Sequence, residues 1–499
     1  MKHKWLARIH LCIVAISVLA GCASIETCTY DSPAEEAKKH TPTLQLTGAQ
    51  KEKYLAVREV VKTHEDFLYH SAVVEPDAYV TRHPLFIVGF EKPRDNYSGE
   101  VGRPYCKKDE LACNAPRFYS KEFIVGNASS ENKDAVERTR DDIDKNLFRD
   151  PRPLVLTHIL NLSRAETPES SKISRKGCFV FNLYGHAEET TWCVSHHKAN
   201  VDKADWKKEG WKGLDRLGDE IDALVREENA THIILMATGW NTRQYESYRD
   251  FLAWMKVISE DFKSSPPFRP VFIGISWESE WPWWQRLPFV SEFTKGNDAD
   301  EIGYSWGNYL LNDVIKPIAF KKNTQLVAIG HSFGTRIVFS AHYVREILLR
   351  NKPVSEHPMT LIGLQPAFPI ARFVSFEGKE HQYMSANKGN ARVVATSSKY
   401  DTANGIMCIG TRYVGAGCGL KALREREKYQ QFVEVLKPNC ADKKECLPDL
   451  KKVSVYDASD FVNCQLKCTS SGAHSDVYDD SMGHFLGEII RSSFDAQKM

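Results

Sequence analysis

One short stretch of this chain, Gly330-His331-Ser332-Phe333-Gly334, limits the folds open to it more than any other. It has the pattern G-x-S-x-G, follows the apolar run 326–329, and precedes a segment, 335–350, whose apolar residues recur at helical spacing. A serine in this context sits on a sharp turn between strand and helix, and the flanking glycines leave room for both elements. The pattern predicts that Ser332 is presented as a nucleophile, although a buried serine in an ordinary strand-to-helix turn would also fit.

Helices and short apolar strands alternate from about residue 206 to the C-terminus. We expect helices at 214–226, 243–262, 302–318, 335–350 and 482–493, and strands at 232–237, 270–276, 326–329, 360–364, 392–396 and 453–456. This alternation predicts an α/β fold with a mostly parallel sheet and helices on both faces. Ligands of such sheets bind at the carboxyl ends of the strands, which is where Ser332 would lie.

The N-terminal region, 51–205, has a mixed pattern of helix-like and strand-like segments. A helix is expected at 52–68 and strands at 85–88 and 154–156, but no residue pattern in it indicates a chemistry. We expect it to supply the first strands of the sheet and an insertion.

The first residues resemble a bacterial lipoprotein signal. Lys2, Lys4 and Arg8 precede the apolar run 11–19, and Leu19-Ala20-Gly21-Cys22 follows, as in a lipobox. The resemblance implies a signal peptide at 1–21, a lipid on Cys22, a polar tether at 22–50, and delivery to the bacterial cell envelope. Ala23 after the cysteine implies the outer membrane, with the chain facing the periplasm or the surface. The alternative is an ordinary secretory signal with a chance Cys22.

The cysteines also indicate an oxidising compartment. Of 13 cysteines, Cys12 lies in the signal, Cys22 would take the lipid, and Cys28 is left over, either free or joined to another chain. The other ten fall into close pairs, which predict five local disulfides: Cys106–Cys113, Cys178–Cys193, Cys408–Cys418, Cys440–Cys446 and Cys464–Cys468. The bridge Cys178–Cys193 is expected to close a β-hairpin. A zinc site is disfavoured because no C-x-x-C pair is present, so no metal is expected.

Composition excludes some classes of function. The 499 residues carry a net charge of only +1, which gives no reason to expect a nucleic-acid partner. No phosphate-binding glycine loop, dinucleotide fingerprint or internal repeat is visible, and no cofactor is expected.

Three motifs in order resemble the α/β-hydrolase superfamily, in particular its poorly characterised bacterial branch with an H-G-[FWY]-N motif and a G-H-S-x-G turn. They are Thr238-Gly239-Trp240-Asn241, Ser276-Trp277 and the segment 330–334. The resemblance spans roughly 206–491 and implies a hydrolase core at 206–499. Thr238 stands where that branch has histidine. The oxyanion in the superfamily is held by backbone N–H groups, so this departure affects the family match more than the mechanism.

The resemblance implies a Ser…Asp…His order for the catalytic residues. Asp401 follows the strand at 392–396, where the superfamily places its acid, although it could also be a turn aspartate. His474 lies in a glycine-containing loop after the last strand, whereas His484 falls inside the final helix. We therefore expect Ser332, His474 and Asp401 to form the triad, in preference to the acids Asp457, Asp460 and Asp476.

The backbone N–H groups of Phe333 and Trp240 would form the oxyanion hole. The predicted activity is that of a membrane-anchored serine esterase or lipase-like hydrolase, which cleaves a carboxylic ester through an acyl-enzyme. An acyltransferase, or a catalytically silent lipoprotein that uses the fold for binding, are the alternatives. Trp277, Trp281, Trp283 and Trp284 would form either the wall of an acyl pocket, an interfacial patch or ordinary packing over the sheet.

Overall fold

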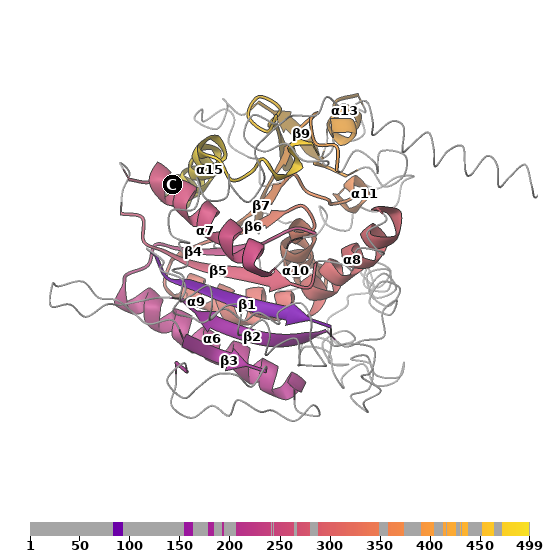
Figure 1. Ribbon diagram of the computed structural model, residues 1–499. Coiled ribbons are helices and arrows are strands. Elements are labelled where there is room, and N and C mark those ends of the chain that lie inside the picture. The colour runs from indigo at the N-terminus through magenta and orange to yellow at the C-terminus, as the bar shows by residue number, and fades with distance from the viewer. Residues whose placement is uncertain are drawn as a thin grey trace, which may run out of the picture.

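A computed structural model of the protein shows an α/β fold built on one ten-stranded, mostly parallel sheet (Figure 1). It describes residues 83–92, 154–162, 178–183, 192–193, 206–240, 242, 244–263, 267–279, 288–348, 358–373, 391–403, 413–415, 417–425, 430, 432–437, 452–463 and 472–498. The strands are β1 (Leu85–Glu91), β2 (Val155–Asn161), β3 (Cys178–Asn182), β4 (His232–Ala237), β5 (Pro270–Trp277), β6 (Gln325–His331), β7 (Met359–Leu364), β8 (Ala391–Ser397), β9 (Val433–Leu436) and β10 (Val453–Asp457).

The strand order is β3-β2-β1-β5-β4-β6-β7-β8-β10-β9. Only β2 runs antiparallel to its neighbours, β1 and β3. From β4 the chain moves to β5 on one side and then to β6 on the other, so the order reverses at β4. The carboxyl ends of β4 and β6 therefore lie side by side at the switch point where open parallel sheets bind ligands.

The central strands consist mostly of apolar residues, which explains why they are buried. Every residue of β4, β5, β6, β7 and β8 is buried, as expected for strands that are covered on both faces. The helices around the sheet are α6 (Trp206–Glu227), α7 (Gln244–Asp261), α8 (Pro288–Ile302), α9 (Lys316–Lys321), α10 (Gly334–Leu348) and α15 (Asp480–Lys498), with short helices α11 (Ile370–Phe373) and α13 (Gly417–Glu425).

Two successive residues of β6 show that α7 and α10 lie on opposite faces, because neighbouring side chains in a strand alternate. A Cβ on Gly330 would lie 2.4 Å from the nitrogen of Thr335 in α10. The ring of His331 instead lies edge-on to Trp254 of α7, with ring centroids 6.5 Å apart. The helix α15 packs on α7, while α8 packs on α10.

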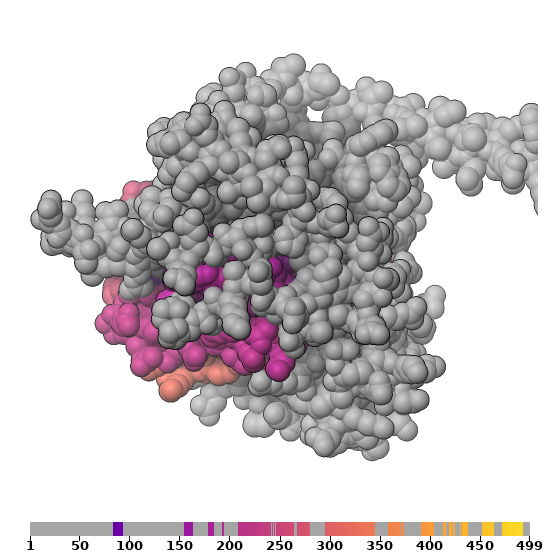
Figure 2. Space-filling model, turned by 60° about the horizontal axis from the view of Figure 1, so that its bottom comes forward, coloured from indigo at the N-terminus to yellow at the C-terminus, as the bar shows by residue number. Residues whose placement is uncertain are grey.

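The helix α6 covers the N-terminal strands and shows an amphipathic pattern, with Leu214, Leu217 and Ile221 buried. A Cβ on its Gly213 would lie 3.0 Å from the ring of Phe181 in β3, so the helix approaches that strand closely. Figure 2 shows the other side of α6, in magenta, as part of the outer surface. Strands from the region 51–205 thus belong to the same sheet and core as the rest.

Most predicted strands and helices are confirmed within a residue or two. Several bounds need correction: α6 begins at Trp206 rather than 214, β2 extends to Asn161 rather than 156, and α15 extends to Lys498 rather than 493. The helix expected at 302–318 begins earlier, as α8 at Pro288, and continues through two π-helical turns, Gly303–Gly307 and Leu310–Ile315, into α9. Three short elements, α11, α13 and β9, were not predicted. The helix expected at 52–68 lies outside the described residues.

The disulfide Cys178–Cys193 is present, with its sulfurs 2.04 Å apart. The predicted hairpin is wrong, because Trp192 pairs with Phe179 through a single parallel bridge. The antiparallel partner of β3 is β2, on its other edge. The signal peptide, Cys22, Cys28, the tether and the other four cysteine pairs lie outside the described residues or have undescribed side chains.

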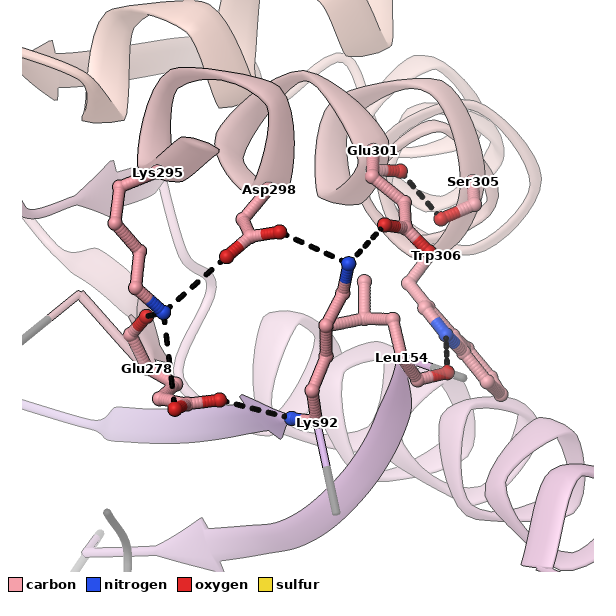
Figure 3. Close-up of polar contacts among 8 residues, drawn as sticks. All are labelled: Lys92, Leu154, Glu278, Lys295, Asp298, Glu301, Ser305 and Trp306. Atoms are coloured by element: carbon pink, nitrogen blue, oxygen red, sulfur yellow. Dashed lines mark hydrogen bonds and ion pairs between the residues drawn. The ribbon is translucent and has the colours of Figure 1, made fainter. Parts of the chain in front are cut away.

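A buried ionic cluster fastens α8 to the carboxyl ends of β1 and β5 (Figure 3). Lys92, which follows β1, contacts Asp298 at 2.9 Å and Glu301 at 2.7 Å. Lys295 contacts Asp298 at 3.2 Å and donates to the carbonyl of Glu278, which follows β5, at 2.7 Å. Burial opposes ionisation of Asp298, but the two lysines outweigh it and lower its pKa from 3.8 to about 2.

Candidate active site

Ser332 lies at the carboxyl end of β6 in a backbone conformation that few non-glycine residues adopt. Its φ is +53° and it is buried. Main-chain hydrogen bonds fix this turn: the Ser332 N–H donates to the carbonyl of Leu364 at 3.0 Å, and its own carbonyl accepts from Thr335 and Ala367 at 3.2 Å each. Such a strained residue is maintained only where its surroundings determine it, as at many functional sites.

The glycines around the turn are required by close packing. A Cβ on Gly334 would lie 2.1 Å from the carbonyl oxygen of Ala237, so β4 and the start of α10 could not approach. A Cβ on Gly239 would lie 2.7 Å from Cβ of Ser332. The chain segment after β4 therefore lies directly against the serine.

Asp401 and His474, which are 73 residues apart in sequence, are hydrogen bonded. Nδ1 of His474 lies 2.8 Å from Oδ2 of Asp401, and both residues are buried. A carboxylate can only accept, so Nδ1 carries the proton and Nε2 is the basic nitrogen of the neutral ring. This is the arrangement by which a carboxylate orients a catalytic histidine.

The two loops that carry this pair are joined by the main chain. Asp401 forms an isolated bridge with Gly472, and the N–H of Ala473 donates to the carbonyl of Tyr400 at 3.1 Å. Gly472 has a φ of +65°, and a Cβ there would lie 2.4 Å from that carbonyl oxygen. His474 itself lies in a short 3₁₀ turn, Ala473–Ser475, rather than in an irregular loop.

The C-terminal side of this turn is fixed to α7. The indole N–H of Trp254 donates to the carbonyl of Val477 at 3.0 Å, and the hydroxyl of Tyr478 donates to Asp250 at 2.9 Å. Burial raises the pKa of Tyr478 well above its ordinary value, and the nearby Asp250 raises it further. The phenol therefore remains protonated and keeps its donor role across the physiological pH range.

The other histidine and the other acids that were considered for the triad have different partners. His484 is largely exposed on α15, with Nδ1 2.8 Å from Asp261 and Nε2 2.8 Å from Glu488. Its hydrogen bond with Asp261 raises its pKa, which favours an ion pair on the surface. Asp457 contacts Arg424 at 2.7 Å, and Asp476 accepts from the N–H of Asn463 at 3.4 Å. Asp460 also lies in this region, where its carbonyl accepts from the Asn463 amide at 2.9 Å.

The two residues expected to form the oxyanion hole are neighbours. The rings of Trp240 and Phe333 have centroids 6.4 Å apart. Thr238, which replaces the histidine of the resembled motif, is buried and its hydroxyl lies 3.0 Å from that of Ser247. Its carbonyl accepts the indole N–H of Trp277 at 2.9 Å. Trp277 is thus a buried packing residue, while Trp281, Trp283 and Trp284 lie outside the described residues.

A buried arginine supports the serine turn from α10. The guanidinium of Arg336 lies 4.8 Å from the centre of the Phe333 ring and donates to the carbonyl of Ala367 at 2.9 Å. Asp300 of α8 accepts from Arg336 at 3.2 Å and binds Arg372 through both carboxylate oxygens. Burial opposes ionisation of Asp300, but the two arginines lower its pKa below the ordinary value. This support was not predicted from sequence.

Within the described residues, no group of histidine, cysteine or acidic side chains is arranged to hold a metal ion, and no helix has the length and apolar character that crossing a membrane requires. No protein-family profile, curated protein or solved structure matches the chain.

Proposed function

We propose that the protein is a serine hydrolase of the α/β-hydrolase type that cleaves a carboxylic ester through an acyl-enzyme. The observation that carries the proposal is the Asp401–His474 hydrogen bond at the same end of the sheet as the positive-φ turn of Ser332. The parallel sheet, the order of the three residues along the chain, and the strand–turn–helix around Ser332 support the same assignment.

In this mechanism Oγ of Ser332 attacks the ester carbonyl while Nε2 of His474 takes its proton. Asp401 holds the Nδ1–H of the imidazole and stabilises the imidazolium that forms. The backbone N–H groups of Phe333 and Trp240 would bind the oxyanion, and each such donor is typically worth about 10²–10³ in rate. His474 then returns the proton to the leaving alcohol, and a water molecule hydrolyses the acyl-enzyme by the same steps.

We further propose that a lipid on Cys22 anchors this hydrolase to the bacterial cell envelope. The proposal rests on the register of basic residues, apolar run and Leu19-Ala20-Gly21-Cys22. The disulfide Cys178–Cys193 supports an oxidising compartment. Replacement of Cys22 by serine should release the protein from the membrane fraction and prevent palmitate incorporation, and a variant that retains both would refute the anchor.

A fluorophosphonate probe on the purified protein tests the proposed activity, together with turnover of p-nitrophenyl acetate. Wild type should be labelled, and Ser332→Ala should lose labelling and about 10⁶-fold in kcat while remaining folded. His474→Ala should be nearly as damaging, and Asp401→Asn should cost about 10⁴-fold.

The matched control for the base is His484→Ala, which changes an exposed histidine on α15. It should leave kcat unchanged. A folded wild type that neither reacts with the probe nor turns over ester would show that the fold is used for binding. An inactive His484→Ala beside an active His474→Ala would reverse the assignment of the base.

A further inference from the structure

We propose that His331 is a positioning residue, whose ring holds the turn that carries His474 at a fixed distance from Ser332. This inference rests on the proposed function, because it assigns a role within the same site. His331 is the residue immediately before Ser332 and is the last residue of β6.

The contact is a hydrogen bond to the main chain of the proposed base. Nε2 of His331 lies 2.9 Å from the carbonyl oxygen of His474, and this bond is buried. A carbonyl oxygen can only accept, so Nε2 of His331 must carry a proton. The two imidazole rings have centroids 4.9 Å apart.

The surroundings leave this ring little freedom. Trp254 and Tyr478 lie edge-on to it, with centroids 6.5 Å and 6.0 Å away. On its other side, Nδ1 would lie 3.3 Å from a Cβ on Gly239. His331 thus fills the space between α7, the turn of His474 and the segment that follows β4.

The hydrogen bond from His331 links the turn of His474 to Ser332, because His331 immediately precedes Ser332 in the sequence. His331 and Ser332 are consecutive, and the hydrogen bonds of the Ser332 main chain fix the turn. A bond from His331 to His474 therefore sets the base relative to the nucleophile across 143 residues of chain. Asp401 orients the imidazole ring, whereas His331 holds the backbone from which that ring projects. Misplacement of a reacting group by about 1 Å can cost on the order of 10² in rate.

The test compares two substitutions of similar length. His331→Gln keeps a side-chain N–H that can reach the carbonyl, whereas His331→Met has none. We expect His331→Met to lower kcat for p-nitrophenyl acetate by about 10–100-fold with KM within about twofold. His331→Gln should recover most of this loss. His484→Met, on the surface of α15, serves as the control and should match wild type. Melting temperatures show whether each variant is folded at the assay temperature.

Proton NMR of the His474 Nδ1–H, which is bonded to Asp401, provides a readout that does not need turnover. Its signal should shift or broaden in His331→Met and return toward wild type in His331→Gln. The inference is overturned if His331→Met leaves both kcat and this signal unchanged, or if His331→Gln is impaired as much as His331→Met. A wild type without esterase activity refutes the proposed function instead, and the NMR comparison then decides whether His331 positions the turn.

Discussion

Removal of Lys92 from the buried ionic cluster should destabilise the protein strongly. In Lys92→Met, Asp298 and Glu301 lose the ammonium that lies 2.9 Å and 2.7 Å from them. The side chains of all three are at most 9% exposed, so water cannot replace the lost partner. Asp298 keeps Lys295 at 3.2 Å, whereas the contact between Glu301 and Lys92 is lost.

Two independent arguments give the magnitude. Breaking a buried ion pair by removing one partner typically costs about 3–5 kcal/mol. The lowering of the Asp298 pKa from 3.8 to about 2 corresponds to roughly 2 kcal/mol, which is what remains of the attraction of both lysines after the cost of burial. We therefore expect Lys92→Met to lower the free energy of unfolding by about 3 kcal/mol at pH 7, with a decrease in Tm on the order of 10 °C or less.

The pH dependence has a defined sign. The pKa of Asp298 is lower in the folded state, so its contribution is present above 3.8 and is lost as the pH falls toward about 2. The difference between wild type and Lys92→Met should therefore narrow over that interval.

Urea unfolding at several pH values measures both effects. Lys263→Met is the matched control, because Lys263 pairs with Glu260 at the surface and its loss should cost less than about 1 kcal/mol. Lys92→Met/Glu301→Gln should recover part of the stability, since a neutral amide then stands where the Glu301 carboxylate faced the ammonium. A cost for Lys92→Met as small as that of Lys263→Met would refute the assignment of the cluster as a stabilising contact.

Three further predictions concern the site and the sheet. Gly239→Ala places a methyl 2.7 Å from Cβ of Ser332 and should lower kcat on the order of 10²-fold; normal turnover would contradict the close approach. Replacing Cys178 and Cys193 by serine removes a bridge that spans 15 residues and should cost about 3 kcal/mol in urea unfolding; an unchanged midpoint would argue against the bridge. Burial lowers the pKa of His232 from 6.5 to about 4 because the folded state disfavours the protonated ring. The free energy of unfolding should therefore fall by up to about 3 kcal/mol as the pH decreases from 6.5 to about 4. His232→Leu should remove that part of the pH dependence, as urea unfolding at several pH values would show.

The strands of the sheet were predictable because a strand that is buried on both faces consists of a nearly continuous run of apolar residues. An apolar run such as 232–237 needs no knowledge of its partners to be identified as a strand, and the structure reproduces its bounds. The helix α8 has no comparable pattern in its sequence. Its residues Lys295, Asp298, Asp300 and Glu301 are charged yet buried, so the usual helical alternation of apolar and polar residues is absent. Their partners lie on other elements, and the sequence does not show them.

The same distinction applies within the candidate site. The turn around Ser332 is local, because its glycines and the adjoining strand and helix are contiguous in sequence. Asp401 and His474 were chosen by the resemblance and by their places after strands, and the structure brings them together, while their catalytic roles stay predictions.

Contacts that hold the turn of His474 in place are of a third kind, and a sequence motif does not reveal them. His331 is variable in the general G-x-S-x-G pattern and matches the histidine of G-H-S-x-G in the resembled branch, but neither pattern says which atom its ring contacts. Its bond to His474, and that of Trp254 to Val477, join side chains to main-chain carbonyls, and an acceptor of that kind is present in every residue. A candidate nucleophile can therefore be proposed from a short sequence pattern, whereas the geometry that the proposed reaction requires depends on main-chain acceptors brought near by the fold.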